Sequence, residues 1–492
     1  MMYKRILFLI PPLDGVRIGK MASFPHIGIG YLSEFMAKNG IQNEVIDMQL
    51  GYSYRYFWRY LETNKPNLIC ISLMTSGCEV GYDLIERIKE RYINLPIVIG
   101  GPHPSILGHQ VLSECKADFF IKGEGEFSLL ELCQNGKIPS DNGRYKLTKN
   151  YRDNIIIEDL DILPFPTYEK FQLKKYTYSN ALGGRGIPII SSRGCPYQCI
   201  FCCNDQIMGR GIRYRSPKNI VNEMVYWWER GIKTFFFMDD NFTFNKGRVM
   251  ELCDLIEATG MQPLKLSVPQ GVRADCVDYE LLNRMKGVGF WFISFGIETG
   301  SDKILQSIKK GTCVDKIEKG IKLACDLGYE VGLFFIIGHP EETPTDFDKS
   351  LRLALRYPVS HAFFYHAIPF WNTELYKWAE EKNYLVSNYD EFIKTHNMFD
   401  GKQNNPFFST PYFTVDQRKD AFDQAKKIEK LVKKNNMMRK LDNKYGLLGR
   451  LITEILYWRF FYLFFQKMYY YKSPRKVINF LIDKFNLGIN QF

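Results

Sequence analysis

The sequence predicts an α/β protein built around two parallel β-sheets. In residues 1–145, short apolar runs alternate with amphipathic stretches, and the same alternation returns in residues 181–375. Strands that alternate with helices form parallel sheets that carry helices on their faces. The length of 492 residues is sufficient for two or three such domains.

The composition is that of an ordinary globular protein, with 46% hydrophobic and 24% charged residues. The net charge of +11 does not by itself indicate nucleic acid, and it would also suit an anionic membrane surface or an acidic substrate. Twelve cysteines are scattered, and only those from Cys195 to Cys203 cluster. This pattern predicts a reducing compartment and one specialised site. The first ten residues run into two prolines, which favours a strand over a signal peptide. We therefore expect a cytoplasmic protein that does not bind nucleic acid.

Residues 1–145 predict a doubly wound, Rossmann-like domain. The expected strands are residues 5–10, 44–47, 68–73, 97–99 and 119–121, and the expected helices are residues 26–39, 79–92 and 124–132. Such sheets bind ligands outside the carboxyl ends of their strands. The loops there carry Asp14-Gly-Val-Arg-Ile-Gly19, Ser72-Leu-Met74 and Gly100-Gly101.

Residues 146–180 predict a linker between two domains. Residues 145–158 alternate in polarity and suit a hairpin, whereas residues 159–168 contain two prolines and should be extended. Strand-like runs then recur at the spacing of βα units, at residues 187–192, 234–238, 264–268, 290–295, 331–337 and 362–367. Helical patterns lie between them, at residues 219–229, 249–258 and 302–308.

A cysteine motif follows the first of these strands. Cys195, Cys199 and Cys202 have the spacing C-x3-C-x2-C. Iron–sulfur clusters usually take four cysteine ligands, so three would leave one iron of a [4Fe–4S] cube open to a small molecule. A zinc site with Cys203 as fourth ligand is the alternative, but structural zinc usually uses two separated pairs and no second C-x2-C pair follows. A disulfide cluster would need an oxidising compartment. We expect Cys203 to be a buried bystander, since adjacent residues do not easily face one metal.

The segment Ser191-Ser-Arg-Gly-Cys-Pro-Tyr-Gln-Cys-Ile-Phe-Cys202 resembles the cluster loop of radical S-adenosylmethionine (SAM) enzymes. The resemblance implies a partial (β/α)6 barrel over residues 181–375 and a [4Fe–4S] cluster on the three cysteines. It also implies that SAM binds the open iron and is cleaved by one electron into methionine and a 5′-deoxyadenosyl radical. The electron would come from an external donor of the flavodoxin or ferredoxin type.

The same resemblance assigns SAM contacts to the strand ends. Asp239 and Asp240 end the second strand, where the family has a glycine–glycine–glutamate motif and a carboxylate holds the amino group of SAM. The glycines are absent here, so which aspartate makes the contact stays open. Ser294 and Glu298 end the fourth strand and are placed to hydrogen-bond ribose hydroxyls.

The adenine of SAM is expected against the fifth-strand motif, which contains Ile336 and Gly338, and against Phe201. Trp371 and Asn372 follow the sixth strand and are expected to shape the adenine or substrate side. Four arginines could contact an anionic substrate or a corrin, and a solvated surface position is an equal alternative for each. They are Arg193, Arg213, Arg215 and Arg273.

The three loops of the first domain resemble the signature of cobalamin-binding domains, D-x-H-x-x-G, S-x-L and G-G. The cobalamin contacts implied by this resemblance are Asp14, Gly19, Ser72, Met74, Gly100 and Gly101. Val16 stands in the place of the cobalt-ligating histidine, so the resemblance implies cobalamin without a protein histidine under the cobalt. His26 and His103 lie on neighbouring loops, and we expect each to make a loop hydrogen bond. A Rossmann-like module with another nucleotide, or with none, is the alternative.

Residues 376–492 predict a helical C-terminal region. Residues 416–434 form a charged amphipathic pattern, and residues 447–471 are densely aromatic and aliphatic. Charged residues interrupt the second stretch, which makes it a poor transmembrane span. A helix packed on the barrel is favoured over a helix lying on the inner face of a membrane, which would suit a lipid-like substrate.

Together these resemblances imply a cobalamin-dependent radical SAM enzyme, a methyltransferase that acts on an unactivated carbon of a small-molecule, lipid or peptide substrate. The methyl group of methylcobalamin would pass to a substrate carbon radical, and a second SAM would restore it. The alternatives are a cyclase or oxidoreductase without methyl transfer and a non-catalytic sensor of redox state or light.

Overall fold

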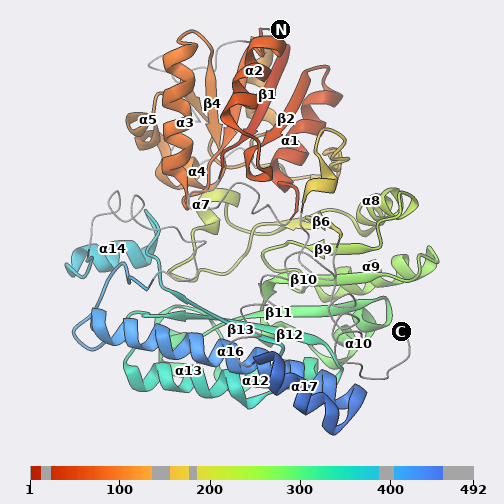
Figure 1. Ribbon diagram of the computed structural model, residues 1–492, viewed down its shortest axis with the longest axis vertical. Helices are drawn as coiled ribbons and strands as arrows, with labels where there is room; N and C mark the ends of the chain where they lie inside the picture. The colour runs from red at the N-terminus through yellow and green to blue at the C-terminus, as the bar shows by residue number, and fades with distance from the viewer. Residues whose placement is uncertain (1, 13–23, 136–155, 177–184, 387–403, 458–492) are drawn as a thin grey trace.

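The computed structural model describes residues 2–12, 24–135, 156–176, 185–386 and 404–457 (Figure 1). The N-terminal sheet lies at one end of the long axis, a second parallel sheet occupies the middle, and the C-terminal helices cover the far end. The predicted α/β class, with a Rossmann-like sheet first and a helical region last, is confirmed. Most of the predicted hairpin, residues 145–158, lies outside the described residues.

The first sheet is parallel throughout, with the strand order β2-β1-β3-β4-β5. Its strands are β1 (Arg5–Ile10), β2 (Gln42–Asp47), β3 (Leu68–Ser72), β4 (Ile97–Gly100) and β5 (Phe119–Phe120). The helices are α1 (Ile27–Lys38), α2 (Tyr54–Asn64), α3 (Cys78–Arg91), α4 (Pro102–Leu107), α5 (Val111–Glu114) and α6 (Glu126–Asn135). All five strands and the three predicted helices are present. The apolar runs predict the strands well because β1, β3 and β4 are buried on both faces.

The second sheet is also parallel, with the strand order β13-β12-β11-β10-β9-β6. Its strands are β6 (Ile187–Ile189), β9 (Thr234–Phe237), β10 (Lys265–Val272), β11 (Phe290–Glu298), β12 (Glu330–Ile337) and β13 (His361–His366). In the described part of the chain, β6 and β13 lie at opposite ends of the sheet and do not pair, so the barrel is open. All six predicted strands are present.

The helices of this region follow the strands. They are α7 (Asn204–Met208), α8 (Pro217–Glu229), α9 (Lys246–Ala258), α10 (Tyr279–Gly287), α11 (Asp302–Ser307), α12 (Val314–Asp326), α13 (Pro344–Arg356) and α14 (Glu374–Glu381). A short antiparallel pair, β7 (Ser192–Arg193) and β8 (Arg213–Tyr214), flanks the cysteine motif.

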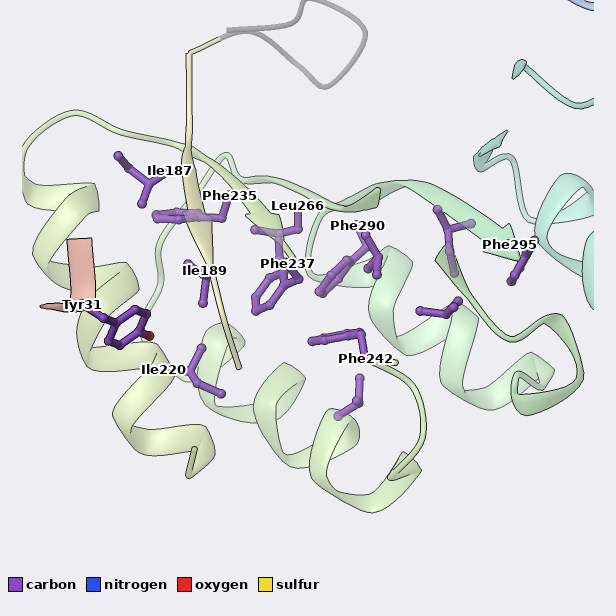
Figure 2. Close-up of a cluster of buried hydrophobic side chains, with 14 of the residues drawn as sticks. Tyr31, Ile187, Ile189, Ile220, Phe235, Phe237, Phe242, Leu266, Phe290 and Phe295 are labelled. Carbon is purple, nitrogen blue, oxygen red and sulfur yellow. The ribbon is translucent and has the colours of Figure 1, made fainter. Parts of the chain in front are cut away.

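The core of the second sheet lies between the strands and their helices. Figure 2 shows Phe235 and Phe237 of β9 beside Leu266 and Phe290 of the next two strands, with Ile220 of α8 below them. All five side chains are fully buried. Because side chains alternate along a strand, the intervening residues face the other side of the sheet, which is the inside of the open barrel.

The C-terminal helix α16 (Val415–Tyr445) runs antiparallel to the edge strand β13. The carboxylate of Glu429 accepts a hydrogen bond from the Phe364 amide at 2.9 Å, and Lys426 donates to the Phe364 carbonyl at 3.4 Å. Helix α17 (Leu447–Tyr457) packs on α16 and adds an ion pair between Lys434 and Glu454 at 2.7 Å. Helix α16 extends well beyond the predicted residues 416–434.

The interpretation of residues 447–471 is tested only in part, because residues 458–492 lie outside the described residues. Among the described helices, none is long and apolar enough to cross a membrane.

The packing of α1 on the segment between the domains provides a test of this arrangement. A Cβ atom added at Gly30 would lie 2.6 Å from Cε1 of Tyr168 and 2.9 Å from Cβ of Pro166. At Gly28, on the same helix, the nearest atom would be Cε1 of His26 at 3.5 Å, an ordinary contact.

We expect Gly30→Ala to lower the free energy of unfolding by about 1–3 kcal/mol, because the added methyl group overpacks a buried contact. Gly28→Ala should leave it unchanged or raise it, since alanine has the higher helix propensity. Urea unfolding of both variants checks this expectation, and equal stabilities would contradict the packing described.

Candidate functional site

The three motif cysteines lie on the loop that leaves β7. Cys195 and Cys199 are half-buried, and Cys202 is exposed as a residue. Cys203 is half-buried rather than buried, and it precedes α7. Burial raises the pKa of Cys202 to about 12 and that of Cys203 to about 11. A metal that takes up these thiols must therefore displace their protons.

No three cysteine, histidine or acidic side chains of the described residues come together as they would around a single metal ion. The ligands of a zinc ion must meet at one point. The cysteines of a four-iron cluster instead bind different irons of the cube, so their sulfur atoms are spread apart.

Asp239 holds the segment in front of the cysteines from the barrel side. Its Oδ1 accepts hydrogen bonds from the Ser191 amide at 2.9 Å and hydroxyl at 3.0 Å, and from the amide and hydroxyl of Ser192. Arg248 donates to the Ser191 carbonyl at 2.6 Å. Burial raises the pKa of Asp239, while Arg248 and the serine hydrogen bonds lower it. Asp239 is therefore committed, through Oδ1, to placing the loop.

Asp240 occupies a different position, at the rim of the cysteine loop. Its residue is exposed, and its carboxylate interacts with the side chain of Asn204 and the backbone of Gly194. Partial removal from water, followed by the charge of Asp239, raises the pKa of Asp240. Oδ2 of Asp239 is buried and has no hydrogen-bond partner among the described residues, so both predicted aspartates stay candidates for a ligand contact.

The N-terminal domain holds the same segment from the other side. Arg193 Nη1 donates to Glu124 Oε1 at 2.8 Å and Nη2 donates to Glu126 Oε1 at 2.7 Å. Arg213 Nη1 donates to Glu124 Oε2 at 2.6 Å, and the Ile157 amide donates to the same oxygen at 2.7 Å. The two glutamates are 1% and 4% exposed, so these charges interact away from bulk water. We call these four charged side chains the interdomain network.

A solvated surface position was the alternative for Arg193, Arg213, Arg215 and Arg273. It is wrong, because all four side chains are largely withdrawn from solvent. Arg215 pairs with Glu223 at 2.6 Å, and Arg273 pairs with Asp275 at 2.7 Å. Arg273 also lies over the Tyr197 ring of the cysteine loop, 3.9 Å from its centroid. These arginines position the loop and its surroundings.

The predicted ribose contacts lie side by side on the inward face of the sheet. Ser294 is 1% exposed, and its hydroxyl has no hydrogen-bond partner among the described residues. Glu298 has φ of 67° and pairs with Lys310 at 2.7 Å. Lys310 is buried and also acts electrostatically on Cys199, whose pKa it lowers against the effect of burial. Sequence reasoning missed Lys310, because a lysine pair before a glycine is typical of a surface turn.

The predicted adenine residues also come together. The rings of Phe201 and His339 are 5.7 Å apart between centroids, and Phe201 and Ile336 pack on the same apolar cluster. Burial lowers the pKa of His339 to about 3, so its ring is neutral. Gly338 has φ of 91°, and its Cα faces the guanidinium group of Arg418 from α16. Sequence reasoning missed Arg418, which lies 80 residues further along the chain within a solvated-looking charge pattern.

Glu342 completes this corner of the site. Its Oε2 accepts hydrogen bonds from the amides of Gly338 at 2.6 Å and His339 at 3.1 Å. Burial raises the pKa of Glu342 to about 7. After the sixth strand, Asn372 donates to the Ile106 carbonyl of α4 at 3.3 Å, which joins this loop to the N-terminal domain.

Two of the three predicted cobalamin loops meet at the first sheet. A Cβ atom at Gly101 would lie 2.8 Å from the Leu73 carbonyl oxygen and 3.0 Å from Ser72 Oγ, so only glycine permits this approach. Gly100 is also part of the contact, since its carbonyl accepts from the Leu73 amide at 2.8 Å. Met74 is 45% exposed beside them. Asp14, Val16 and Gly19, from the first loop, lie outside the described residues.

His26 makes the expected loop hydrogen bond, whereas His103 lies in α4 and contacts a side chain of α3. His26 accepts from the Ile29 amide at 3.2 Å and contacts Ser72 Oγ at 3.2 Å. His103 contacts the Tyr82 hydroxyl at 2.6 Å. Burial lowers their pKa values to about 4 and about 3, so both rings are neutral.

Two buried hydroxyl groups beside these loops suit a bound ligand. Thr75 and Ser76 follow Met74 and are 8% and 7% exposed. Neither hydroxyl has a hydrogen-bond partner within the described part of the chain. Buried hydroxyls normally find partners, so these two fit a loop that receives a polar molecule.

Loss of one carboxylate from the interdomain network should lower the stability of the protein, because its arginine partners keep their charges. Glu124→Gln should lower the free energy of unfolding by roughly 2–4 kcal/mol, because Arg193 and Arg213 would keep their charges in a buried place. Amide hydrogen exchange in residues 192–200 should speed up as well. Glu131→Gln on α6 is the matched control and should change neither quantity. Equal exchange in both variants would contradict the role given to Glu124.

Two family models match the chain. The Radical SAM superfamily matches residues 189–354, and the B12 binding domain matches residues 22–132. The second match begins after Asp14 and Gly19. It includes Ser72, Met74, Gly100 and Gly101.

Relatives span most of the chain. An uncharacterized methyltransferase from Pyrococcus horikoshii is 26% identical over 400 residues, which are 78% of this chain and 84% of that protein. A Methanocaldococcus jannaschii protein named as a methylthiotransferase is 30% identical over 316 residues, which are 62% of this chain and 67% of that protein.

The fold is shared with a solved enzyme. The radical SAM methyltransferase TsrM from Kitasatospora setae, solved with cobalamin and a [4Fe–4S] cluster bound, superposes with a TM-score of 0.63 at 16% identity and covers 86% of this chain and 85% of its own. With the open parallel barrel, the cysteine loop at its strand ends and the two matched domains, the chain belongs to the radical SAM superfamily, in the group that carries a B12 binding domain in front of the radical SAM domain.

Proposed function

We propose that this chain is a cobalamin-dependent radical SAM methyltransferase that acts on an unactivated carbon. The observation that carries the proposal is the interdomain network. In it, glutamates of the B12 binding domain form ion pairs with Arg193, which lies two residues before the first cysteine. Transfer between two cofactors requires both to be held at a set separation. When bound, the cluster supplies the electron that cleaves SAM, and cobalamin carries the methyl group.

Cys195, Cys199 and Cys202 are proposed as the cluster ligands. The segment in front of their loop is held by Asp239 and, through Arg193, by Glu124 and Glu126, which lowers the entropy left to be lost there when the cluster binds. Lys310 places a positive charge beside Cys199, which favours its thiolate.

The SAM contacts are proposed on the inward ends of the strands. Asp240 would take the amino group, because Oδ1 of Asp239 is already bound to two serines; Oδ2 of Asp239, which has no partner among the described residues, is the alternative contact. Ser294 and Glu298 would hydrogen-bond the ribose; the unpartnered hydroxyl of Ser294 supports this role. The neutral ring of His339, with the apolar side chains named above, would receive the adenine.

The cobalamin contacts are proposed at Ser72, Met74, Gly100 and Gly101, with Asp14 and Gly19 added by the sequence signature alone. The hydrogen bonds that His26 and His103 already make within the protein support a cobalt without a histidine from either position.

The partners are proposed at a general level. The electron donor would be an external flavodoxin or ferredoxin, and the substrate a small molecule or peptide. The net charge of +11 would attract either an acidic donor or an acidic substrate.

Aspartate substitutions separate binding from loop placement. Asp240→Asn should weaken SAM binding by roughly ten- to a thousandfold, because the charged partner of the amino group is lost, and it should leave the cluster absorbance intact. Asp239→Asn should instead reduce the amount of cluster retained. Calorimetric titration of SAM and visible absorbance measure the two effects. The assignment fails if Asp240→Asn binds SAM as the parent does.

Anaerobic reconstitution with iron, sulfide and cobalamin, followed by SAM and a cell extract, tests the reaction. We expect 5′-deoxyadenosine and a product one methyl group heavier, measured by mass spectrometry with deuterated SAM. Cys195→Ala, Cys199→Ala or Cys202→Ala should abolish both the cluster absorbance and 5′-deoxyadenosine, whereas Cys203→Ala should retain them. Products lacking the label would instead indicate ring formation or oxidation.

A further inference from the structure

The strand register places aromatic residues on the same face as the proposed SAM contacts. Ser294 lies opposite Gly332, and Gly332 lies opposite His361. One step further along the strands, Gly296 lies opposite Phe334, and Phe334 lies opposite Phe363. Because neighbours in parallel register point to the same side, Phe334, His361 and Phe363 face the inside of the open barrel, as Ser294 does.

These side chains form one continuous row. The Phe334 and Phe363 rings stack at 5.3 Å, and the His361 and Phe363 rings stack at 5.7 Å with an interplanar angle of 7°. Tyr365 continues the row 6.5 Å from Phe334, and Phe292 continues it 6.0 Å from His361. We call these five residues the aromatic row.

The row is partly open to solvent, unlike the opposite face of the sheet. Phe334, His361 and Phe363 are half-buried and Tyr365 is 48% exposed. In contrast, Phe335 and Phe364, which point to the helices, are fully buried.

The row begins at the proposed reaction centre. A Cβ atom at Gly271 would lie 3.2 Å from the Phe334 ring, and a Cβ atom at Gly296 would lie 2.9 Å from Glu298 Oε1. The two glycines therefore let Phe334 and the Glu298–Lys310 pair lie close together over β10 and β11, next to Cys199. A molecule on the row would lie within reach of the SAM site.

A positive charge lies beside the row at the edge strand β13, and it comes from α16. Lys433 lies over the Phe363 ring with Nζ 5.7 Å from its centroid, and it is exposed. Its neighbours Lys426 and Lys440 are paired with Glu429 and Glu330. Within the described ranges, Lys433 has no carboxylate partner and so is available to an anion.

Other polar groups also lie on this face. Glu330 lies opposite Phe292 in the strand register, and its carboxylate pairs with Lys440 at 2.7 Å. The hydroxyl of Ser267 is buried and, like that of Ser294, has no hydrogen-bond partner among the described residues. Burial, followed by the charge of Lys433, lowers the pKa of His361 to about 4, so His361 adds a neutral ring.

We infer that the aromatic row binds the substrate, and that this substrate is a flat, apolar molecule that carries an anionic group directed at Lys433. Aromatic rings stack favourably on flat apolar surfaces, and a lysine at their end selects negative charge. The inference rests on the proposed function, because the row is taken as part of the same active site.

The test uses the full chain and a fluorescent probe, 1-pyrenebutyrate, with the uncharged 1-pyrenebutanol as its matched partner. We expect the anionic probe to bind about fivefold more tightly than the alcohol, the effect of one partly exposed charge pair. Lys433→Gln should remove this preference, and Lys433→Arg should retain it. Lys430→Gln, on the same helix and exposed, should behave as the parent protein.

A second variant tests the row itself. Phe363→Leu should weaken both probes about three- to tenfold, because stacking is lost while apolar volume is largely kept. Thermal unfolding of each variant controls for folding. Three results would overturn the inference: no probe binding, equal binding of the two probes, or binding that is unchanged in Lys433→Gln and Phe363→Leu. Absence of binding would mean that another part of this chain covers the row.

Cleavage of SAM in the reconstituted parent protein and variants is measured in parallel. Lys430 is exposed and lies outside the aromatic row, so 5′-deoxyadenosine formation without substrate should persist in Lys430→Gln. Loss of SAM cleavage in the parent with normal probe binding would count against the proposed function and leave the probe site standing.

Discussion

The position of one short segment, Ser191–Gly194, decides the geometry of the whole candidate site, and buried charges hold it from two sides. Asp239 binds it from the barrel, while Glu124 and Glu126 bind Arg193 from the N-terminal domain. Burying such charges costs desolvation energy, and much of their mutual attraction only offsets that cost. The network therefore contributes orientation more than net stability. Removing one partner is expensive, because the others remain charged.

Domains joined in one chain usually move relative to each other unless their interface is large or closely packed. Here four contacts act together. Besides the ionic contacts, Arg215 donates to the Tyr31 hydroxyl of α1 at 3.0 Å, and Gly30 lies against Tyr168 and Pro166. Asn372 reaches α4 from the far side of the barrel. These contacts fix the orientation of the first sheet relative to the cysteine loop.

The sequence was most informative where apolar runs coincide with buried strands. Residues 5–10 and 331–337 are predicted almost to the residue, because buried parallel strands are apolar throughout. The side-chain roles were less accessible. Arg193 meets its partners across 67 and 69 residues, and no local pattern reports such a pairing. Asp239 and Asp240 look equivalent in sequence, and only burial and the hydrogen bonds of Asp239 Oδ1 to two serines separate them.

The open barrel leaves the backbone of β13 as an edge, and exposed edges invite pairing with strands of other molecules. Side chains of helix α16, and not a seventh strand, bind this edge. Glu429 accepts a hydrogen bond from the Phe364 amide, and Lys426 donates one to the Phe364 carbonyl. The same helix brings Arg418 to Gly338 and Lys433 to Phe363. A chain shortened before α16 would thus lose its protection against self-association, and it would also lose Arg418 and Lys433 from the candidate site. Solubility and chemistry therefore both depend on this helix.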